Sequence, residues 1–165
     1  MVVTPLNADL QTLPTQSYYW PLWLKDGESW CLGIAPLWLL VADETTLTRY
    51  ERQVDLSYQQ TPLNEDLLTC LKKLFLATPC PAYPLTLGFT GGLMGWMSYP
   101  NSSRANSEKI SFPSICLGFY DVFIRPNNEG KVHLYAPSAS LAEMVLAQLQ
   151  TSPTQYSFTL TEPFQ

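Results

Sequence analysis

The residues from Leu85 to Pro100, LTLGFTGGLMGWMSYP, constrain the fold more than any other stretch of this chain. Three glycines, Gly91, Gly92 and Gly95, interrupt a run of apolar and aromatic residues. A glycine in a strand packs no side chain, so it marks a bulge, a bend or a close approach of two backbones. Because the run is too apolar for a surface loop, we expect a buried strand that kinks at Gly91-Gly92 and continues to Tyr99.

A phosphate-binding loop is the other interpretation of a glycine-rich stretch. The sequence contains neither GxGxxG nor Gly-Lys-Ser/Thr here, and no helix signal follows the glycines directly. We therefore interpret Gly91, Gly92 and Gly95 as a structural kink.

The composition is charge-poor and apolar. Of 165 residues, 46% are apolar and only 14% are charged, against roughly 25% charged residues in typical soluble domains. The length fits one domain or a fragment of a larger protein. Such a balance predicts a sizeable core and, in addition, an apolar face that packs against another domain or mediates self-association.

Several partner classes are excluded by charge and hydropathy. The net charge is −5 and no basic stripe is present, which excludes a nucleic-acid-binding surface. No apolar run reaches the ~18 residues needed to span a bilayer. The residues from Met1 onward lack the basic and apolar regions of a signal peptide, so we expect a cytoplasmic protein without membrane partners.

The cysteines do not predict a metal site. They show no CxxC pair and no spacing typical of zinc, and His133 is the only imidazole. Buried free thiols in a reducing compartment are the expected state of these residues. The four are Cys31, Cys70, Cys80 and Cys116.

The first third of the chain predicts a two-hairpin meander that ends near Leu56. Ser17–Leu24 is an aromatic strand, and Pro21 places it at a sheet edge or gives it a bulge. A turn signal at Lys25-Asp26-Gly27 leads into the apolar run Ser29–Asp43. An edge strand or an irregular start is expected over Met1–Thr15, and a half-exposed strand is expected over Thr45–Tyr50.

Two helices are predicted. The first covers Glu65–Ala77, with Asn64 as its N-cap and Lys72 and Lys73 on its solvent side. The second covers Leu141–Gln150. The predicted core face of the first helix comprises Leu67, Leu68, Leu71, Leu74 and Phe75, and a capping box of Ser140 and Glu143 opens the second.

The clearest hairpin joins a strand over Pro113–Arg125 to a returning strand over Lys131–Ala136. A surface loop is expected over Asn101–Ser111, and one more strand over Tyr156–Leu160. The predicted elements follow the order strands, helix, strands, helix, and hairpins make up most of the strand connections. This order predicts an α+β domain with a mainly antiparallel sheet and two helices.

The residues alone do not assemble a catalytic site. His133 falls on the polar face of a predicted hairpin, where a surface role is expected. Asp121 is the one carboxylate embedded in an apolar strand, and a hydrogen-bonded structural aspartate is the favoured interpretation.

The glycine stretch carries a family resemblance. Phe89–Tyr99, FTGGLMGWMSY, resembles the F-x-G-G-x-x-G-x-x-x-Y segment of aminodeoxychorismate synthase component I and anthranilate synthase component I. Leu117–Asp121 is similar to the G-x-Y-D-W strand of these enzymes, and Phe158–Thr161 is similar to the segment before their catalytic domain. The resemblance spans roughly the last half of the chain and, more weakly, the first; Pro100 stands where most members have Asp.

The resemblance implies a fold and a function. Family members build an α/β/β/α sandwich, whose C-terminal chorismate-binding domain holds the Mg²⁺ site and, in the aminodeoxychorismate branch, a P-I-K-G-T lysine. This sequence contains no P-I-K-G-T and ends at Gln165, about where that domain should begin. Residues 1–165 would then be the N-terminal domain, not catalytic alone, with no catalytic residue and no cofactor of its own.

The full enzyme would be a transferase that aminates chorismate to 4-amino-4-deoxychorismate in para-aminobenzoate and folate biosynthesis. A glutamine amidotransferase subunit would supply the ammonia. Two alternatives stay open at this point: the corresponding domain of anthranilate synthase component I, and a stand-alone binding or interaction module.

An effector site is also implied by the resemblance, since the first strands of family members bind tryptophan. The two family segments involved fall on Trp23–Asp26 and near Ser29–Leu32, although no Arg or Asp of the second segment is kept. The expected effector-binding residues are Lys25, Asp26, Ser29 and Trp30. In the alternative interpretation, the Trp30 side chain fills this space from within the core.

Overall fold

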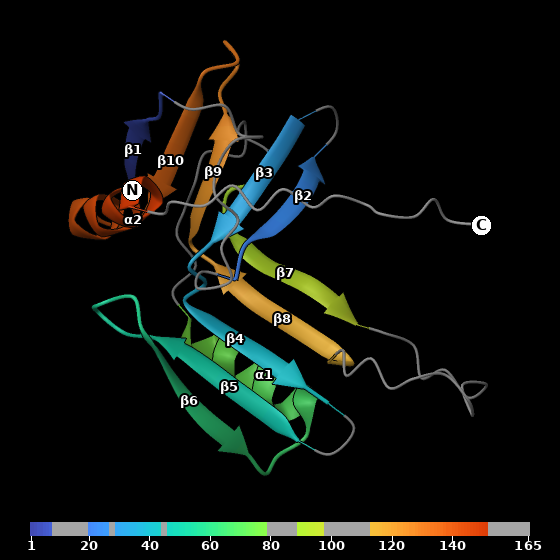
Figure 1. The fold of residues 1–165 in the computed structure, drawn as a ribbon. Coiled ribbons are helices and arrows are strands. Elements are labelled where there is room, and N and C mark those ends of the chain that lie inside the picture. Colours follow the sequence, from blue (N-terminus) through green and yellow to red (C-terminus); the bar gives the residue numbers. More distant parts are fainter. Residues whose placement is uncertain (8–19, 27–28, 44–45, 79–88, 98–112, 152–165) are drawn as a thin grey trace, which may run out of the picture.

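The chain folds into two antiparallel sheets and two helices. The computed structural model describes residues 1–7, 20–26, 29–43, 46–78, 89–97 and 113–151. Within these ranges lie ten strands in two five-stranded sheets, and every strand pair is antiparallel (Figure 1). The α+β class and the mainly antiparallel sheet predicted from the sequence are confirmed.

Sheet A contains the first and the last strand of the described chain. Its strand order is β1-β10-β9-β3-β2, and helix α2 (Ala139–Thr151) packs against one face. Leu32, Ile124 and Leu134 from three neighbouring strands form the core beneath this helix, where they meet Ala142 and Val145. The strands are β1 Val2–Pro5, β2 Leu22–Asp26, β3 Ser29–Ile34, β9 Val122–Pro126 and β10 Val132–Ala136.

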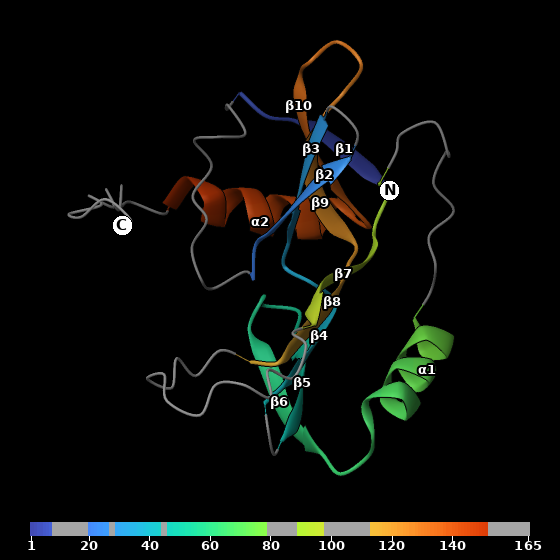
Figure 2. The ribbon, with the colours of Figure 1, turned by 90° about the vertical axis from the view of Figure 1, so that its right-hand side faces the viewer.

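Sheet B has the order β6-β5-β4-β8-β7, and helix α1 (Leu67–Ala77) covers one of its faces. Trp38, Leu40 and Phe119 form the core between sheet and helix, together with Cys70. In Figure 2, α1 lies to the right of sheet B and α2 extends to the left of sheet A. The strands are β4 Trp38–Ala42, β5 Leu47–Arg52, β6 Tyr58–Leu63, β7 Gly92–Met97 and β8 Ile115–Tyr120.

Two stretches of chain pass directly from one sheet to the other. β3 of sheet A continues into β4 of sheet B through residues 35–37, and β8 of sheet B continues into β9 of sheet A through Asp121 alone. The sequence predicted each stretch as one apolar run, over Ser29–Asp43 and Pro113–Arg125. Each run is indeed continuous in sequence, but it contributes one strand to each of the two sheets. At one of the two crossings, Ala35 has a φ of 45°.

The glycine-rich strand begins at the predicted kink rather than running through it, and it is not buried. Gly91 and Gly92 have φ values of 103° and 138°, a region that L side chains rarely adopt. Among the described strands, β7 pairs with β8 alone and lies at the end of sheet B, and most of its side chains are exposed. Met94 is buried, whereas the exposed side chains are Leu93, Trp96 and Met97. Residues 98 and 99 lie outside the described part of the chain.

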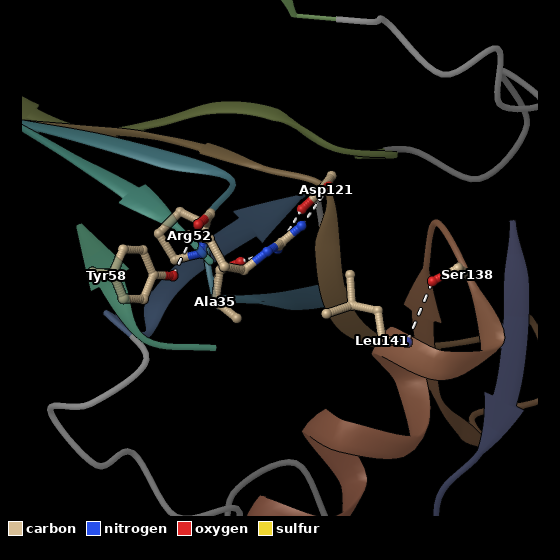
Figure 3. Close-up of polar contacts among 7 residues, drawn as sticks. Ala35, Arg52, Tyr58, Asp121, Ser138 and Leu141 are labelled. Atoms are coloured by element: carbon tan, nitrogen blue, oxygen red, sulfur yellow. Dashed lines mark hydrogen bonds and ion pairs between the residues drawn. The ribbon is translucent and has the colours of Figure 1, made fainter. Parts of the chain in front are cut away.

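The helix boundaries differ from the predicted ones by one turn or less. α1 begins at Leu67, because Asp66 and not Asn64 is its N-cap and accepts from the Thr69 N–H at 3.0 Å. α2 begins at Ala139, where Ser138 and not Ser140 caps the helix by accepting from the Leu141 N–H at 3.3 Å (Figure 3). The predicted Ser140–Glu143 capping box is therefore wrong.

The core face of α1 is narrower than predicted. Leu67, Leu71 and Leu74 pack on sheet B, with Cys70 buried between them. The side chain of Leu68 is 76% exposed, and Phe75, although it contacts the Trp38 ring edge-on, is 47% exposed. Leu68 therefore faces away from the sheet that the helix covers, whereas Phe75 lies at the margin of the contact.

The predicted hairpin of the second half is confirmed as β9–β10, with Asn127 organising its turn. β1 is the predicted edge strand at the N-terminus, and β2, preceded by Pro21, is the other edge of sheet A. β6 was not predicted, since its sequence YQQTPL is polar. The predicted loop over Asn101–Ser111 and strand over Tyr156–Leu160 lie outside the described residues.

Replacement of Gly95 by Ala should unfold the edge of sheet B. A Cβ at this position would lie 2.0 Å from the Cys116 carbonyl oxygen on the neighbouring strand, so the two backbones must separate. We expect a loss of about 3 kcal/mol in the free energy of unfolding, measured by urea denaturation.

Gly130→Ala is the matched control. Gly130 also has a positive φ, 77°, but nothing lies within 4 Å of its Cβ position. The control should lose only about 1 kcal/mol through backbone strain. Equal losses in the two variants would contradict the close approach at Gly95.

Candidate functional site

The most highly organised polar group in the described chain lies where the two sheets join. We call it the crossing junction and define it as Ala35, Pro36, Arg52, Tyr58 and Asp121. Arg52 ends β5, Tyr58 begins β6, and the other three residues belong to the two stretches that cross between the sheets. Figure 3 shows Arg52 reaching from its strand toward Asp121 on one side and Ala35 on the other.

Arg52 binds both crossing stretches. Its Nη1 and Nη2 donate to Oδ1 and Oδ2 of Asp121 at 2.8 and 2.9 Å, a bidentate pair in the geometry that guanidinium and carboxylate favour. Nη1 also donates to the Ala35 carbonyl oxygen. The side chains of Arg52 and Asp121 are only 8% and 9% exposed, so each charge depends on the other for compensation.

Two further contacts close the junction. The Tyr58 hydroxyl donates to the Pro36 carbonyl oxygen at 2.8 Å, beside the Ala35 carbonyl held by Arg52 (Figure 3). The turn between β5 and β6 then places Leu56, 5% exposed and with a φ of 66°, in the sheet A core. The hairpin of sheet B thus supplies both a polar clamp and an apolar contact to sheet A.

Asp121 therefore has the structural role that the sequence favoured. Both carboxylate oxygens accept from Arg52, which leaves this group occupied as an ion-pair partner. The sequence did not identify Arg52 or Tyr58, because both occur in strands of alternating or polar pattern where a solvent-exposed side chain is the expectation. No feature of the sequence indicates that this arginine, directly before a polar turn, is buried.

The two stretches that carry the family resemblance are neighbours in sheet B. β7 pairs with β8 so that Gly92 lies opposite Tyr120, Met94 opposite Gly118, and Gly95 opposite Leu117. A Cβ on Gly118 would lie 2.8 Å from the Tyr120 ring and 3.0 Å from Leu39. The glycines of both stretches thus permit one close-packed strand pair, which ends at Asp121.

The titratable groups on this strand pair are neutral at pH 7. Burial raises the pKa of the Cys116 thiol from about 9 to about 11, so almost none is present as the nucleophilic thiolate. Burial likewise raises the pKa of Tyr120, whose hydroxyl donates to the Trp20 carbonyl oxygen at 2.8 Å. Both groups act as packing elements rather than as acids, bases or nucleophiles.

The expected effector residues occupy the end of one hairpin. Lys25 pairs with Trp30 and Asp26 with Ser29 in the backbone register of β2 and β3. Trp30 is 49% exposed, so the alternative in which its ring fills the core is wrong. Leu24 and Cys31 pack on the opposite face of the hairpin, against Phe123 and Tyr135. Tryptophan binding at this hairpin stays a prediction.

The remaining polar candidates have local partners. His133 lies on β10, is half-buried, and its Nδ1 is 2.9 Å from the Lys131 carbonyl oxygen. A hollow of about 430 Å³ opens at the start of α1, and its acidic residues are engaged: Asp43 accepts from Thr46, and Glu65 pairs with Lys73. Within the described ranges, no group of three His, Cys, Asp or Glu residues is placed to hold a metal ion.

Comparison of the chain with protein-family models and with curated proteins finds no match. Neither of the two helices described here is long and apolar enough to cross a membrane.

Removal of the Arg52 guanidinium should destabilise the whole protein. Arg52→Met leaves the Asp121 carboxylate buried without its partner, which we expect to lower the free energy of unfolding by about 3 kcal/mol or more. Arg49→Met is the matched control on the same strand. Its partner Glu51 is 50% exposed, so the loss should stay below about 1 kcal/mol.

The double variant Arg52→Met/Asp121→Leu provides a second readout for the junction. It removes both charges and should recover part of the stability lost in Arg52→Met. A double variant less stable than Arg52→Met, or an Arg52→Met variant as stable as Arg49→Met, would contradict the proposed clamp.

Cys116 predicts a dependence of stability on alkaline pH. A thiol with a raised pKa in the folded state loses its proton first in the unfolded chain, so its contribution to stability is complete below about pH 9 and disappears toward pH 11. The stability difference between the wild type and Cys116→Ala should therefore narrow between pH 8 and pH 11. A difference that does not change with pH would show that the thiol titrates normally.

Proposed function

We propose that this chain is the N-terminal, non-catalytic domain of aminodeoxychorismate synthase component I. The full enzyme would transfer ammonia to chorismate and form 4-amino-4-deoxychorismate for para-aminobenzoate and folate synthesis. In this proposal the chemistry and the Mg²⁺ belong to a separate chorismate-binding domain, and the present domain completes the fold around it.

One observation carries the proposal. The two motif-bearing stretches, Phe89–Tyr99 and Leu117–Asp121, are separated by residues 100–116, and their described residues pair directly as β7 and β8. The motif positions also have physical roles: Gly95 and Gly118 permit close contacts, and Asp121 holds Arg52. Both stretches thus belong to one strand pair and its junction, as expected if they are parts of a single family pattern.

The state of the titratable groups supports a non-catalytic role. The buried carboxylate of Asp121 is fully engaged by Arg52, and the thiol of Cys116 is protonated at neutral pH. Neither side chain is thus available to attack a substrate or to transfer a proton. The described residues instead provide a surface that can pack against another protein.

Exposed apolar side chains support a role in association. Leu68 and Leu76 on the outer side of α1 are 76% and 81% exposed, and Met97 on the β7 edge is 64% exposed. Side chains of this kind favour contact with another protein surface. The partners proposed on this basis are the chorismate-binding domain and the glutamine amidotransferase subunit.

The decisive experiment is an amination assay with chorismate, Mg²⁺ and ammonia. We expect no product from the purified chain alone, and product when a component I chorismate-binding domain is added. Product from the chain alone would show that a catalytic site has been overlooked. If product appears only with the chorismate-binding domain of an anthranilate synthase component I, the chain belongs to the tryptophan branch; if neither domain forms product with it, the interpretation as a stand-alone binding module replaces the proposal.

Surface variants test whether the outer side of α1 takes part in this association. Leu68→Gln/Leu76→Gln removes two exposed apolar side chains, so it should leave stability nearly unchanged but raise the concentration of the added domain needed for half-maximal product. Lys72→Gln, on the same helix, is the matched control. An unchanged half-maximal concentration in Leu68→Gln/Leu76→Gln would exclude this side of α1 from the contact.

A further inference from the structure

The β2–β3 hairpin carries two exposed tryptophans and an exposed lysine. Trp23 and Trp30 are 37% and 49% exposed, and their rings meet edge-to-face with centroids 6.4 Å apart. The Lys25 Nζ lies 6.0 Å from the centroid of the Trp30 ring. We call these three residues the hairpin aromatic cluster. The cluster combines aromatic rings and a cation, which attract one another, on one small surface.

The strand register places the hairpin aromatic cluster on the face of sheet A that α2 also covers. Trp23 lies opposite Leu32, and Leu32 lies opposite Ile124. Leu32 and Ile124 belong to the core beneath α2. Lys25 lies opposite Trp30, which is two residues from Leu32 on the same strand. All three side chains of the cluster therefore lie on one face, beside the part that α2 covers.

β2 is also an edge strand. Among the described strands of sheet A, it pairs with β3 alone, and it forms the right-hand edge of this sheet in Figure 1. The edge of a sheet presents backbone N–H and C=O groups that accept a further strand. A lysine on an edge strand ordinarily discourages such pairing. Since β2 carries Lys25, an added strand has to supply a partner for this charge.

A second copy of β2 supplies that partner. Two identical strands in an antiparallel pair are related by a two-fold axis perpendicular to the sheet, and residues opposite one another lie on the same face. An axis at Leu24 aligns all five residues of β2, Leu22–Asp26. Because Trp23 and Lys25 each lie one residue from Leu24, the Trp23 of each copy then lies opposite the Lys25 of the other.

Other registers of the same pair are less favourable. With the axis at Lys25, the two lysines would lie directly opposite one another, and like charges in that position are destabilising. With the axis at Trp23, Lys25 would lie opposite Pro21, which has no N–H group to donate across the pair. Charge complementarity and strand length therefore both select the register centred on Leu24.

We propose that the β2 edge is the interface of a symmetric homodimer, in which two β2 strands pair about Leu24 and join the two copies of sheet A. Each Lys25 then lies between the Trp30 of its own chain and the Trp23 of the second copy, which gives two equivalent cation–π contacts across the interface. On the opposite face, the two Leu24 side chains meet beside the cluster that contains Cys31 and Phe123. This inference does not depend on the proposed enzyme family, because it rests on the register and the charge of β2.

Sedimentation equilibrium of the full chain tests for the dimer and for the role of Lys25. We expect a reversible equilibrium between monomer and dimer. Lys25→Gln removes the cation from both contacts and should raise the dimer dissociation constant about tenfold. Lys131→Gln is the matched control, because this exposed lysine of the same sheet pairs with Glu129 on the β9–β10 hairpin, and it should leave the constant unchanged. A chain that is monomeric up to about 1 mM, or equal constants in the two variants, would overturn the proposal.

Cysteine cross-linking tests the register. A cysteine in place of Leu24 would lie opposite its copy across the two-fold axis, with the Cβ atoms about 5 Å apart, close to the separation that a disulfide spans. Leu24→Cys should therefore yield more covalent dimer on mild oxidation than the unmodified chain. Val3→Cys is the control on β1, the opposite edge of sheet A, where Val3 is 46% exposed. Cross-linking of Val3→Cys that equals or exceeds that of Leu24→Cys would show that β2 is not the interface.

Discussion

The buried ion pair between Arg52 and Asp121 is the interaction on which the rest of the structure depends. It lies where two strands leave one sheet and enter the other, a place where the regular pairing of strands is interrupted. Backbone groups at such a point need other partners. Arg52 supplies one to the Ala35 carbonyl while it neutralises Asp121, and Tyr58 supplies another to Pro36. Arg52, at the end of β5, thereby holds both stretches that cross between the sheets.

Close packing of backbones is the second constraint, and glycine makes it possible. Gly95 lies against the Cys116 carbonyl, and Gly118 lies beneath the Tyr120 ring. Tyr120 in turn reaches the Trp20 carbonyl through its hydroxyl. Small residues on β7 and β8 therefore allow large ones to be buried at the sheet junction, while β7 itself stays at an exposed edge. The apolar residues of the glycine-rich stretch therefore lie on the surface as well as in the core.

The sequence predicted the individual helices and strands better than the contacts between them. Alternation and turn residues identified the β9–β10 hairpin, and helical periodicity located α1, because these signals are local. Burial of β7 was predicted wrongly, since composition does not reveal whether a strand has neighbours on both sides. β6 was missed because its sequence is polar and lacks the apolar alternation of a strand. The Asp121 carboxylate was recognised as structural from its apolar neighbours, but Arg52, 69 positions away, is brought to it only by tertiary structure.

The two strands that cross the junction have a consequence for how the chain can be divided. Sheet A draws on residues 2–5, 22–34 and 122–136, whereas sheet B draws on residues 38–63, 92–97 and 115–120. The segments are interleaved along the chain, so no single cut separates one sheet from the other. The two sheets are distinct in space but interleaved in sequence, so neither can be exchanged or expressed as one continuous segment of the chain.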